Sequence, residues 1–195
     1  ADVVAVSQNS ENLRIASALL PSLMTFQANV ALPADNERLA GWILNLWGSL
    51  DILVNNAGIS PKGGTELTTQ PDTIFEEILQ VNLFGPYLCT KRMLPVLQKA
   101  ESPRVVNIGS SVGIMSPDLK GAYSISKAAL HALSVAFANE LRGKVSVNTL
   151  CPGWVRTDMA PDGPGDPRTS AESTLWLVTQ PWEFTGNIIR GRAAV

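Results

Sequence analysis

A phenol and an ammonium group stand four residues apart at Tyr123 and Lys127. On a helix this spacing places both side chains on one face, one turn apart. The pKa of a free tyrosine is about 10, and a neighbouring cation favours the phenolate, so we expect Tyr123 to exchange protons near neutral pH. The pattern is common by chance, however, and taken alone it also fits a surface tyrosine beside a solvated lysine.

Further features surround this pair in a fixed order. Ser110 lies 13 residues before Tyr123, shortly after the apolar run Arg104 to Ile108. The other three features are, in chain order, the turn Asn55-Asn56-Ala57-Gly58, Asn82 within a long helical pattern, and the segment Cys151 to Thr157 after another apolar run. Each feature stands at the end of an expected strand or on an expected helix, so the whole set is far more specific than any one member.

Together these features resemble the short-chain dehydrogenase/reductase family, from Ala1 through Gly186. The resemblance implies reversible hydride transfer between NAD(P)H and a carbonyl or secondary alcohol, with Tyr123 as general acid/base. It implies that Lys127 lowers the pKa of Tyr123 and binds the nicotinamide ribose. Ser110 would hold the substrate oxygen. Asn82 would support a proton-relay water near Lys127, a role that depends on a local helix distortion which the sequence does not show.

The same resemblance assigns a nicotinamide cofactor to positions along the chain. Its adenosine side is lined by Ser7, Gln8, Asn29, Val30, Asn55, Ala57 and Gly58, and its nicotinamide side by Pro152, Gly153, Val155 and Thr157. Tyr123 and Lys127 also contact it. An acidic residue at Ser7 or Gln8 would bind the ribose hydroxyls of NAD, and its absence favours NADP(H) over NAD(H). The arginine that often holds the 2′-phosphate is also replaced, by Gln8.

A serine hydrolase is a rival interpretation. Gly109 to Gly113 matches Gly-x-Ser-x-Gly with Ser111 at its centre, which is the nucleophile elbow of α/β-hydrolases. The elbow must lead straight into a helix and needs a late histidine, whereas a loop follows here and no histidine comes after His131. Ser111 also competes with Ser110 for the catalytic role. A catalytically silent, cofactor-sensing or structural relative is the third alternative, and the complete set of four catalytic positions argues against it.

His131 is the only histidine, and it extends the Tyr123–Lys127 stripe by one turn. A catalytic role competes with that of a hydrogen-bonded core or interface histidine, which we favour because the surrounding helix is apolar nearly all round. Trp154 lies beside the nicotinamide segment, where it could wall the substrate pocket. The short segment Ala160 to Arg168 is where a substrate-covering loop would lie, so we expect an open pocket; the sequence does not identify the substrate.

The elements that position these residues follow from the hydrophobic pattern. Strands are expected at Val3 to Val6, Leu23 to Val30, Asp51 to Asn55, Arg104 to Ile108, Val145 to Leu150 and Asn187 to Ile189. Helices are expected at Asn12 to Leu20, Asp35 to Trp47, Thr73 to Leu97 (disturbed by Pro86), Tyr123 to Leu141 and Thr169 to Leu177. This alternation predicts one Rossmann-like α/β domain over residues 1–195, a doubly wound parallel sheet whose ligands bind beyond the carboxyl ends of the strands.

Composition excludes several other classes of protein. Of 195 residues, 45% are hydrophobic and 16% charged. The net charge of −2 does not indicate the basic surface that a nucleic-acid-binding protein needs. No apolar run approaches the roughly 18 residues that cross a bilayer. Cys89 and Cys151 match no metal spacing, so we expect no metal and two buried thiols in a reducing compartment, the cytoplasm. A targeting segment ahead of Ala1 would be invisible in this sequence.

The family's glycine-rich turn has no match in the chain, since no glycine has partners at both +4 and +6. The chain also begins inside an apolar run without Met. We therefore expect the first β–α unit, about 30 residues, to be absent, with unpaired strand edges at Val3 to Val6 and Ile52 to Asn55 and weak cofactor binding by this chain alone. At full length we expect a homo-oligomer, a dimer or tetramer, because the helix Tyr123 to Leu141 is apolar on more faces than a sheet covers.

Overall fold

The computed structural model describes residues 1–61, 66–113 and 121–194 of the chain. The strands are β1 (Val4–Ser7), β2 (Met24–Gln27), β3 (Ile52–Asn55), β4 (Arg104–Ile108), β5 (Ser146–Cys151), β6 (Ile188–Arg190) and β7 (Ala193–Ala194). The helices are α1 (Ser10–Leu19), α2 (Pro33–Trp47), α3 (Asp72–Leu79), α4 (Gly85–Leu97), α5 (Gly121–Glu140) and α6 (Pro167–Val178). Each expected strand and helix is present with ends that differ by a few residues, except that the expected helix Thr73 to Leu97 is divided into α3 and α4. Among the strands of the described residues, β7 was not expected.

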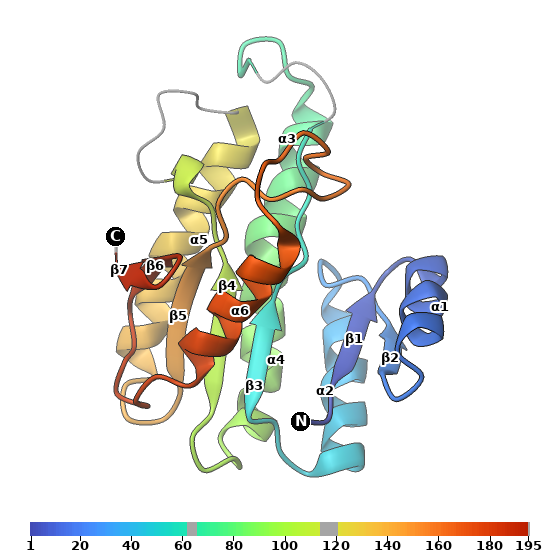
Figure 1. Ribbon diagram of the computed structural model, residues 1–195, viewed down its shortest axis with the longest axis vertical. Helices are drawn as coiled ribbons and strands as arrows, with labels where there is room; N and C mark the ends of the chain where they lie inside the picture. The colour runs from blue at the N-terminus through green and yellow to red at the C-terminus, as the bar shows by residue number, and fades with distance from the viewer. Residues whose placement is uncertain (62–65, 114–120, 195) are drawn as a thin grey trace.

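The strands form two sheets within the described residues, one of β1 and β2 and one in the order β3-β4-β5-β6-β7. Every pairing is parallel except that of β6 with β7. β1 and β3 point the same way, but a gap separates them and no ladder joins them (Figure 1). The expected unpaired edges are therefore observed at these two strands, and Ile52 and Val54 of β3 are each about 40% exposed.

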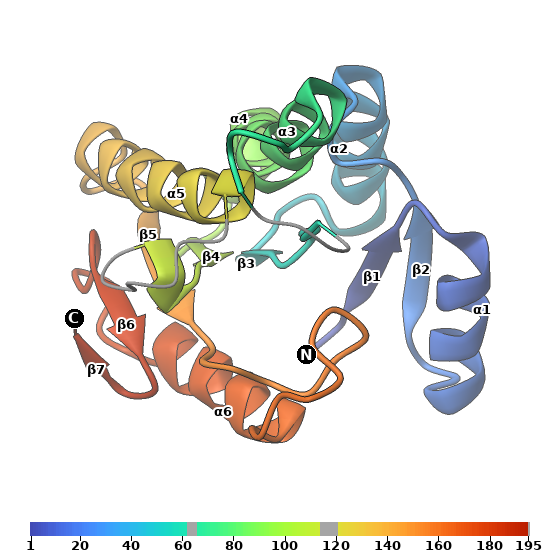
Figure 2. The same ribbon diagram turned by 90° about the horizontal axis from the view of Figure 1, so that it is seen from above.

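Helices cover both faces of the strands, as the predicted α/β fold requires. Figure 2 shows α2, α3, α4 and α5 on one face and α6 on the other, with α1 beyond β2. One hydrophobic cluster joins both sheets, because Val6 and Phe26 of the small sheet pack with Leu39 of α2, Val105 of β4 and Phe137 of α5. This shared core holds the two sheets together, because the free energy gained by removing apolar surface from water grows with the buried area.

The helix expected at Thr73 to Leu97 is interrupted, but the interruption comes before Pro86, the residue expected to disturb it. A π-helical turn at Gln80–Phe84 separates α3 from α4. Pro86 lies in the first turn of α4, where a missing N–H is tolerated. The turn contains Asn82 and displaces it relative to a regular helix, and such π-turns are frequent at functional sites.

A close approach of backbones at Gly113 fixes the short 3-10 turn Ser111–Gly113 against α5. A β-carbon at Gly113 would lie 2.7 Å from the Ala128 nitrogen and 2.8 Å from the Lys127 carbonyl carbon. We expect Gly113→Ala to lower the free energy of unfolding by about 1–3 kcal/mol, as overpacking does. Gly41→Ala is the matched control, because Gly41 lies in α2 with open space around it. That change should stabilise the helix by about 0.5–1 kcal/mol in the same urea titration.

Candidate functional site

Three neighbouring strands end at one edge of the larger sheet, at Asn55, Ile108 and Cys151. β4 pairs in parallel with both β3 and β5, so these ends meet. The residues that follow the ends include Ser110 and Pro152, which the sequence placed on this edge. The edge is where open α/β sheets bind ligands.

Ser110, Tyr123 and Lys127 come together beyond the end of β4. The Ser110 side chain lies close enough to the Tyr123 hydroxyl to lower its pKa as a hydrogen-bonding neighbour would. The Lys127 Nζ lies 5.8 Å from the centre of the Tyr123 ring and donates a 2.7 Å hydrogen bond to the Ile108 carbonyl oxygen. This proximity favours Ser110 over Ser111 as the partner of Tyr123.

Burial sets the electrostatics of these groups. It lowers the pKa of Lys127 to about 8, against an opposing effect of the Cys151 thiol. Burial also raises the pKa of Tyr123 above its ordinary value, and the hydrogen bond from Ser110 only partly offsets this. The net pKa of Tyr123 is therefore raised and not lowered as expected, because desolvation of the phenolate outweighs the effects of its neighbours. Tyr123 is a protonated phenol at neutral pH and can donate a proton.

Asn82 lies in the π-helical turn, fully buried. Its Oδ1 accepts from the Ile59 backbone N–H at 2.8 Å, and its Nδ2 donates to the Ile59 carbonyl oxygen at 2.9 Å and to the Ser126 Oγ at 3.0 Å. The Ser126 hydroxyl in turn donates to the Tyr123 carbonyl oxygen at 2.7 Å. Asn82 thus ties the segment after Gly58 to the helix of Tyr123, and the helix distortion that its proposed role needs is present.

The Asn-Asn-Ala-Gly turn approaches the same centre through Gly58. A β-carbon there would lie 3.4 Å from the Asn82 Oδ1 and 3.5 Å from the Lys127 Nζ. Asn55, by contrast, points into the protein: its Nδ2 donates to the Asn107 Oδ1 at 2.7 Å and to the Thr90 Oγ1 at 3.1 Å. Its amide nitrogen therefore holds the turn in place, while Ala57 of the same turn is exposed.

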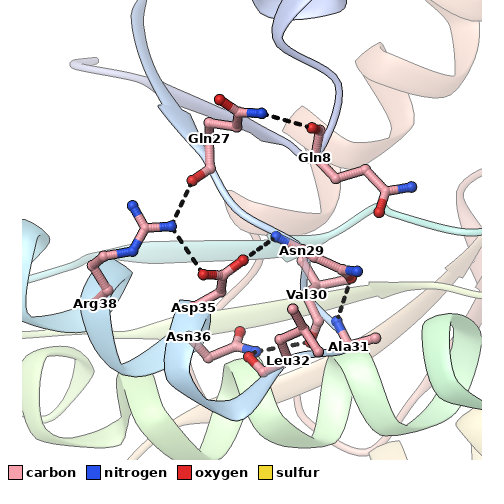
Figure 3. Close-up of polar contacts among 9 residues, drawn as sticks. All are labelled: Gln8, Gln27, Asn29, Val30, Ala31, Leu32, Asp35, Asn36 and Arg38. Carbon is pink, nitrogen blue, oxygen red and sulfur yellow. Dashed lines mark hydrogen bonds and ion pairs between the residues drawn. The ribbon is translucent and has the colours of Figure 1, made fainter.

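A polar network joins the ends of β1 and β2 to the start of α2 (Figure 3). The Gln27 side chain donates to the Gln8 carbonyl oxygen at 3.1 Å. The Arg38 guanidinium donates to the Gln27 carbonyl oxygen and to the Asp35 carboxylate, both at 2.9 Å. Asp35 also accepts from the Asn29 backbone N–H at 2.7 Å, and this bond together with Arg38 lowers the pKa of its carboxyl.

These residues line a hollow of about 250 Å³ at the expected adenosine side. Arg38 was not predicted there. Its three-residue spacing from Asp35 indicates only a surface ion pair, and its approach to Gln27 and Gln8 depends on how α2 packs against β2. The turn at Asn29 and Val30 also ends β2 earlier than expected, because the Asn29 Oδ1 accepts from the Ala31 N–H at 3.0 Å.

The segment after β5 folds back on itself. Gly153 has φ +84°, a conformation that favours glycine. Gly165 donates to the Trp154 carbonyl oxygen at 3.0 Å and accepts from the Arg156 N–H at 2.9 Å. The expected nicotinamide segment, with Val155 and Thr157, therefore packs against the expected substrate-covering segment. The Trp154 side chain is 62% exposed.

His131 is a core histidine, as expected, and it is 5% exposed. It was also expected to be hydrogen-bonded through its ring, but within the described residues only one of its two ring nitrogens has polar contacts. Its Nε2 lies 3.4 Å from the Ser110 backbone nitrogen and 3.8 Å from the Cys151 Sγ. Its Nδ1 is buried without a hydrogen-bond partner in the part of the chain that the structure describes. Both cysteines, Cys89 and Cys151, are free and buried as predicted.

A second hollow, of about 290 Å³, lies elsewhere on α5. Its lining includes Val112, Gly113, Ile125 and Ala128, and it shares no residue with the Ser110–Tyr123–Lys127 group. It therefore belongs to an apolar surface rather than to the reacting centre. Within residues 1–61, 66–113 and 121–194, no three His, Cys, Asp or Glu side chains gather as metal ligands. Among the same residues, no helix has the length and apolar character to cross a membrane.

The sequence of residues 1–165 matches the family model described as short chain dehydrogenase. The chain belongs to the short-chain dehydrogenase family. It is 40% identical over 147 residues to the rhamnolipids biosynthesis 3-oxoacyl-[acyl-carrier-protein] reductase of Pseudomonas aeruginosa, covering 72% of this chain and 57% of that one. It is 34% identical over 168 residues to the 3-oxoacyl-[acyl-carrier-protein] reductase of Synechocystis, covering 83% and 65%. The chain thus spans about three fifths of the length of these curated relatives.

Solved structures share the fold of this short-chain dehydrogenase. The NADPH-bound carbonyl reductase from chicken fatty liver superposes with a TM-score of 0.85 at 24% identity, covering all of this chain and 86% of that one. The carbonyl reductase Sniffer of D. melanogaster gives a TM-score of 0.88 at 25% identity, covering 99% and 86%. The Rossmann-like α/β fold predicted from the sequence is therefore confirmed, and the hydrolase interpretation is dropped.

The residues of this short-chain dehydrogenase fit a nicotinamide cofactor along the strand ends. Gln8 and Asn29 border the hollow at one end. Gly58 leaves the space beside Lys127 free of a side chain at the centre. The glycine turn at Gly153, where a β-carbon would meet no atom within 4 Å, marks the other end. The order of these three regions along the edge matches the adenosine, ribose and nicotinamide parts of the expected molecule.

Proposed function

We propose that this short-chain dehydrogenase reduces a carbonyl compound to a secondary alcohol with NADP(H), reversibly, and that Tyr123 is the general acid/base. The observation that carries the proposal is the convergence of Ser110, Tyr123 and Lys127 beyond the end of β4, with the Lys127 Nζ 5.8 Å from the centre of the Tyr123 ring and Ser110 acting on the Tyr123 hydroxyl. A side-chain acid must lie within hydrogen-bond reach of the atom that it protonates. Because the two hydroxyls lie close together, a substrate oxygen placed between them could accept from both the Ser110 and the Tyr123 O–H.

The protonation states suit reduction. Tyr123 is protonated at neutral pH because burial raises the pKa of its hydroxyl, so it can give a proton to the developing alkoxide. Ser110 donates a hydrogen bond to the same oxygen. Lys127, with a pKa of about 8, carries positive charge at neutral pH and favours the tyrosinate that forms. A bound nicotinamide supplies the hydride, and Gly58, Gly153, Val155 and Thr157 would hold it near Tyr123.

Two observations favour a carbonyl reductase over a catalytically silent relative. The residues that the reaction needs are all present and lie around one strand end rather than being replaced. Relatives in sequence are named 3-oxoacyl reductases, and structures with the same fold are named carbonyl reductases. Asn82, which braces the turn of Gly58 against α5, supports the proton relay in this proposal. The free, buried thiols support a reducing compartment, the cytoplasm.

The test is consumption of NADPH by the full-length protein that the gene encodes, against a panel of ketones, aldehydes and 3-oxoacyl thioesters. We expect a fall in absorbance at the NADPH band with at least one carbonyl class, and an equal yield of alcohol. Absence of turnover across the panel, with NADPH binding intact, would favour the cofactor-sensing alternative instead.

Arg38 supports the preference for NADP(H). It is the cation of the adenosine-side hollow and its side chain is 57% exposed, although it is paired there with Asp35, and the β1 end carries Gln8 rather than an acidic residue. We expect Arg38→Gln to weaken NADPH binding by about 3- to 10-fold, as loss of one exposed charge-assisted contact does. NADH binding should not change. Isothermal titration of both cofactors, with Arg142→Gln as the control at the far end of α5, distinguishes this from general damage; an equal loss for both cofactors would contradict it.

We also propose that the full-length protein self-associates through α5. Its outward face carries exposed Ile125, Ala128, Ala132 and Val135 at helical spacing, beside the apolar hollow. Small and apolar side chains in a stripe allow a two-fold copy of the helix to pack closely. Light scattering at micromolar concentration should give a dimer or tetramer mass. Val135→Glu should shift that mass toward the monomer; a monomer mass for the unaltered protein would contradict the proposal.

A further inference from the structure

Two side chains of α5 contact the end of β4 on either side of one residue. The Lys127 Nζ donates to the carbonyl oxygen of Ile108, at 2.7 Å. The Ser110 backbone N–H points to the His131 Nε2, at 3.4 Å, which is long for a hydrogen bond but aligned as one. Lys127 and His131 are one turn apart on the helix, so the pair spans the Ile108–Ser110 backbone.

Gly109, between the two contacts, is packed directly under the imidazole. A β-carbon at Gly109 would overlap the His131 Nε2 and would lie 2.5 Å from the Thr149 Cγ2. Its φ is not positive, so the glycine is required by space rather than by backbone conformation. The ring of His131 therefore sits on the backbone of the segment that carries Ser110.

The hydrogen bond defines which imidazole nitrogen carries the proton. Since the Ser110 backbone N–H can only donate, the His131 Nε2 must accept, and the proton of the neutral ring lies on Nδ1. The neighbouring titratable groups are Lys127 on the same helix and Cys151 on β5. Burial and the charge of Lys127 lower the pKa of His131 to about 4, and burial raises the pKa of Cys151 to about 11. The acceptor state thus persists throughout the neutral range.

We infer that His131 is a positioning residue: its imidazole accepts the Ser110 backbone N–H and, together with Lys127, holds the end of β4 so that the Ser110 hydroxyl meets the Tyr123 hydroxyl. The inference rests on the proposed function, in which both hydroxyls bind the substrate oxygen. His131 itself contacts neither substrate nor cofactor. It acts by preventing the β4 end from shifting relative to α5, and a displacement of about 1 Å at a reacting centre can cost about 100-fold in rate.

The first test is independent of activity and uses the full-length protein labelled with ¹⁵N-histidine and carrying no histidine tag. The His131 imidazole resonances are those that disappear from the spectrum of the His131→Gln variant. The expected spectrum is that of the Nδ1-protonated neutral tautomer, unchanged as the pH is lowered to about 5. An Nε2-protonated tautomer, or a titration near pH 6.5, would overturn the inference, because the ring would then not accept from Ser110.

The second test compares kinetics of three variants. His131→Gln places an amide oxygen where it can accept from the Ser110 N–H, whereas His131→Leu keeps the volume without an acceptor. We expect kcat to fall about 10- to 100-fold in the Leu variant with the KM for NADPH unchanged, and to stay within about threefold in the Gln variant. In a Ser110→Ala background His131→Leu should have no further effect on kcat, since residues that act as a unit are not additive.

The outcomes separate the two proposals. Equal losses in the Gln and Leu variants would show that His131 contributes packing alone, and unchanged kcat in the Leu variant would show no role; either result overturns the inference. Additive losses with Ser110→Ala would overturn it as well. A protein without carbonyl reductase activity in its unaltered form would contradict the proposed function instead, and the tautomer seen by NMR would still decide whether His131 accepts from Ser110.

Discussion

Tyr123→Phe should abolish turnover in the full-length protein while leaving cofactor binding nearly intact. The change removes one oxygen, the one that lies near Ser110 and that we propose donates the proton to the substrate. General acid catalysis contributes about 10²- to 10⁴-fold, so we expect kcat to fall by a factor in that range. The ring remains in place under the Lys127 ammonium, so the dissociation constant for NADPH should stay within about twofold.

The chain offers a matched control, because it contains one other tyrosine. Tyr87 lies on α4, where its hydroxyl accepts from the Lys91 Nζ at 3.1 Å and its ring stacks on Phe137. Tyr87→Phe also removes one phenolic oxygen, but outside the site. Its kcat should stay within about twofold of that of the unaltered protein. More than a tenth of normal turnover in the Tyr123 variant would sink the assignment of Tyr123 as the acid.

Hydrophobic pattern was sufficient to predict the fold of this chain, because its strands are continuous apolar runs. Arg104 to Ile108 is an example, with both residue limits as observed. Parallel pairing of such runs then places Ser110 and Pro152 at one edge without any knowledge of side-chain contacts. The residues expected to carry chemistry were instead predicted from their resemblance to a family's motifs, whose spacing is defined along the chain rather than across it.

Features that depend on contacts between distant segments could not be predicted in this way. The π-helical turn at Gln80–Phe84 has the same apolar spacing as the helices around it, so no local signal marks it. The approach of Arg38 to Gln27 requires the packing of α2 on β2. The predicted direction of the Tyr123 pKa shift was wrong for the same reason. Residue spacing reveals the cation one turn away but not how deeply the hydroxyl is buried, and burial has the larger effect on the pKa.

Lys127→Met should make the protein more stable at neutral pH while removing its activity. Lys127 is 4% exposed, and burial lowers its pKa from 10.5 to about 8. A shift of that size corresponds to a cost of about 3 kcal/mol for keeping the charged form folded. Methionine avoids this cost but leaves the Ile108 carbonyl oxygen without its partner, which costs about 1–2 kcal/mol. We expect a net gain of about 1–2 kcal/mol at pH 7, measured by urea unfolding.

The pH dependence follows from the direction of the shift. The folded-state pKa of Lys127 lies below the unfolded value, so between about pH 8 and pH 10.5 the unfolded chain binds more protons than the folded one. The stability of the unaltered protein therefore rises with pH across this window through Lys127, and below pH 8 the full cost remains. The advantage of the Met variant should be largest at pH 7 and should shrink toward pH 10. Lys144→Met, at an exposed position, should show no such dependence.

The combination of these effects distinguishes a functional lysine from a structural one. If Lys127 served only the fold, its replacement would make the protein less stable. Its hydrogen bond to the Ile108 carbonyl oxygen would then be its whole contribution to the free energy of unfolding. A lysine kept buried at a cost to the fold is instead explained by what its charge does for Tyr123 one turn away. If Lys127→Met lowered stability at pH 7 and left kcat unchanged, the ammonium group would be a brace for the end of β4 and not part of the reacting centre.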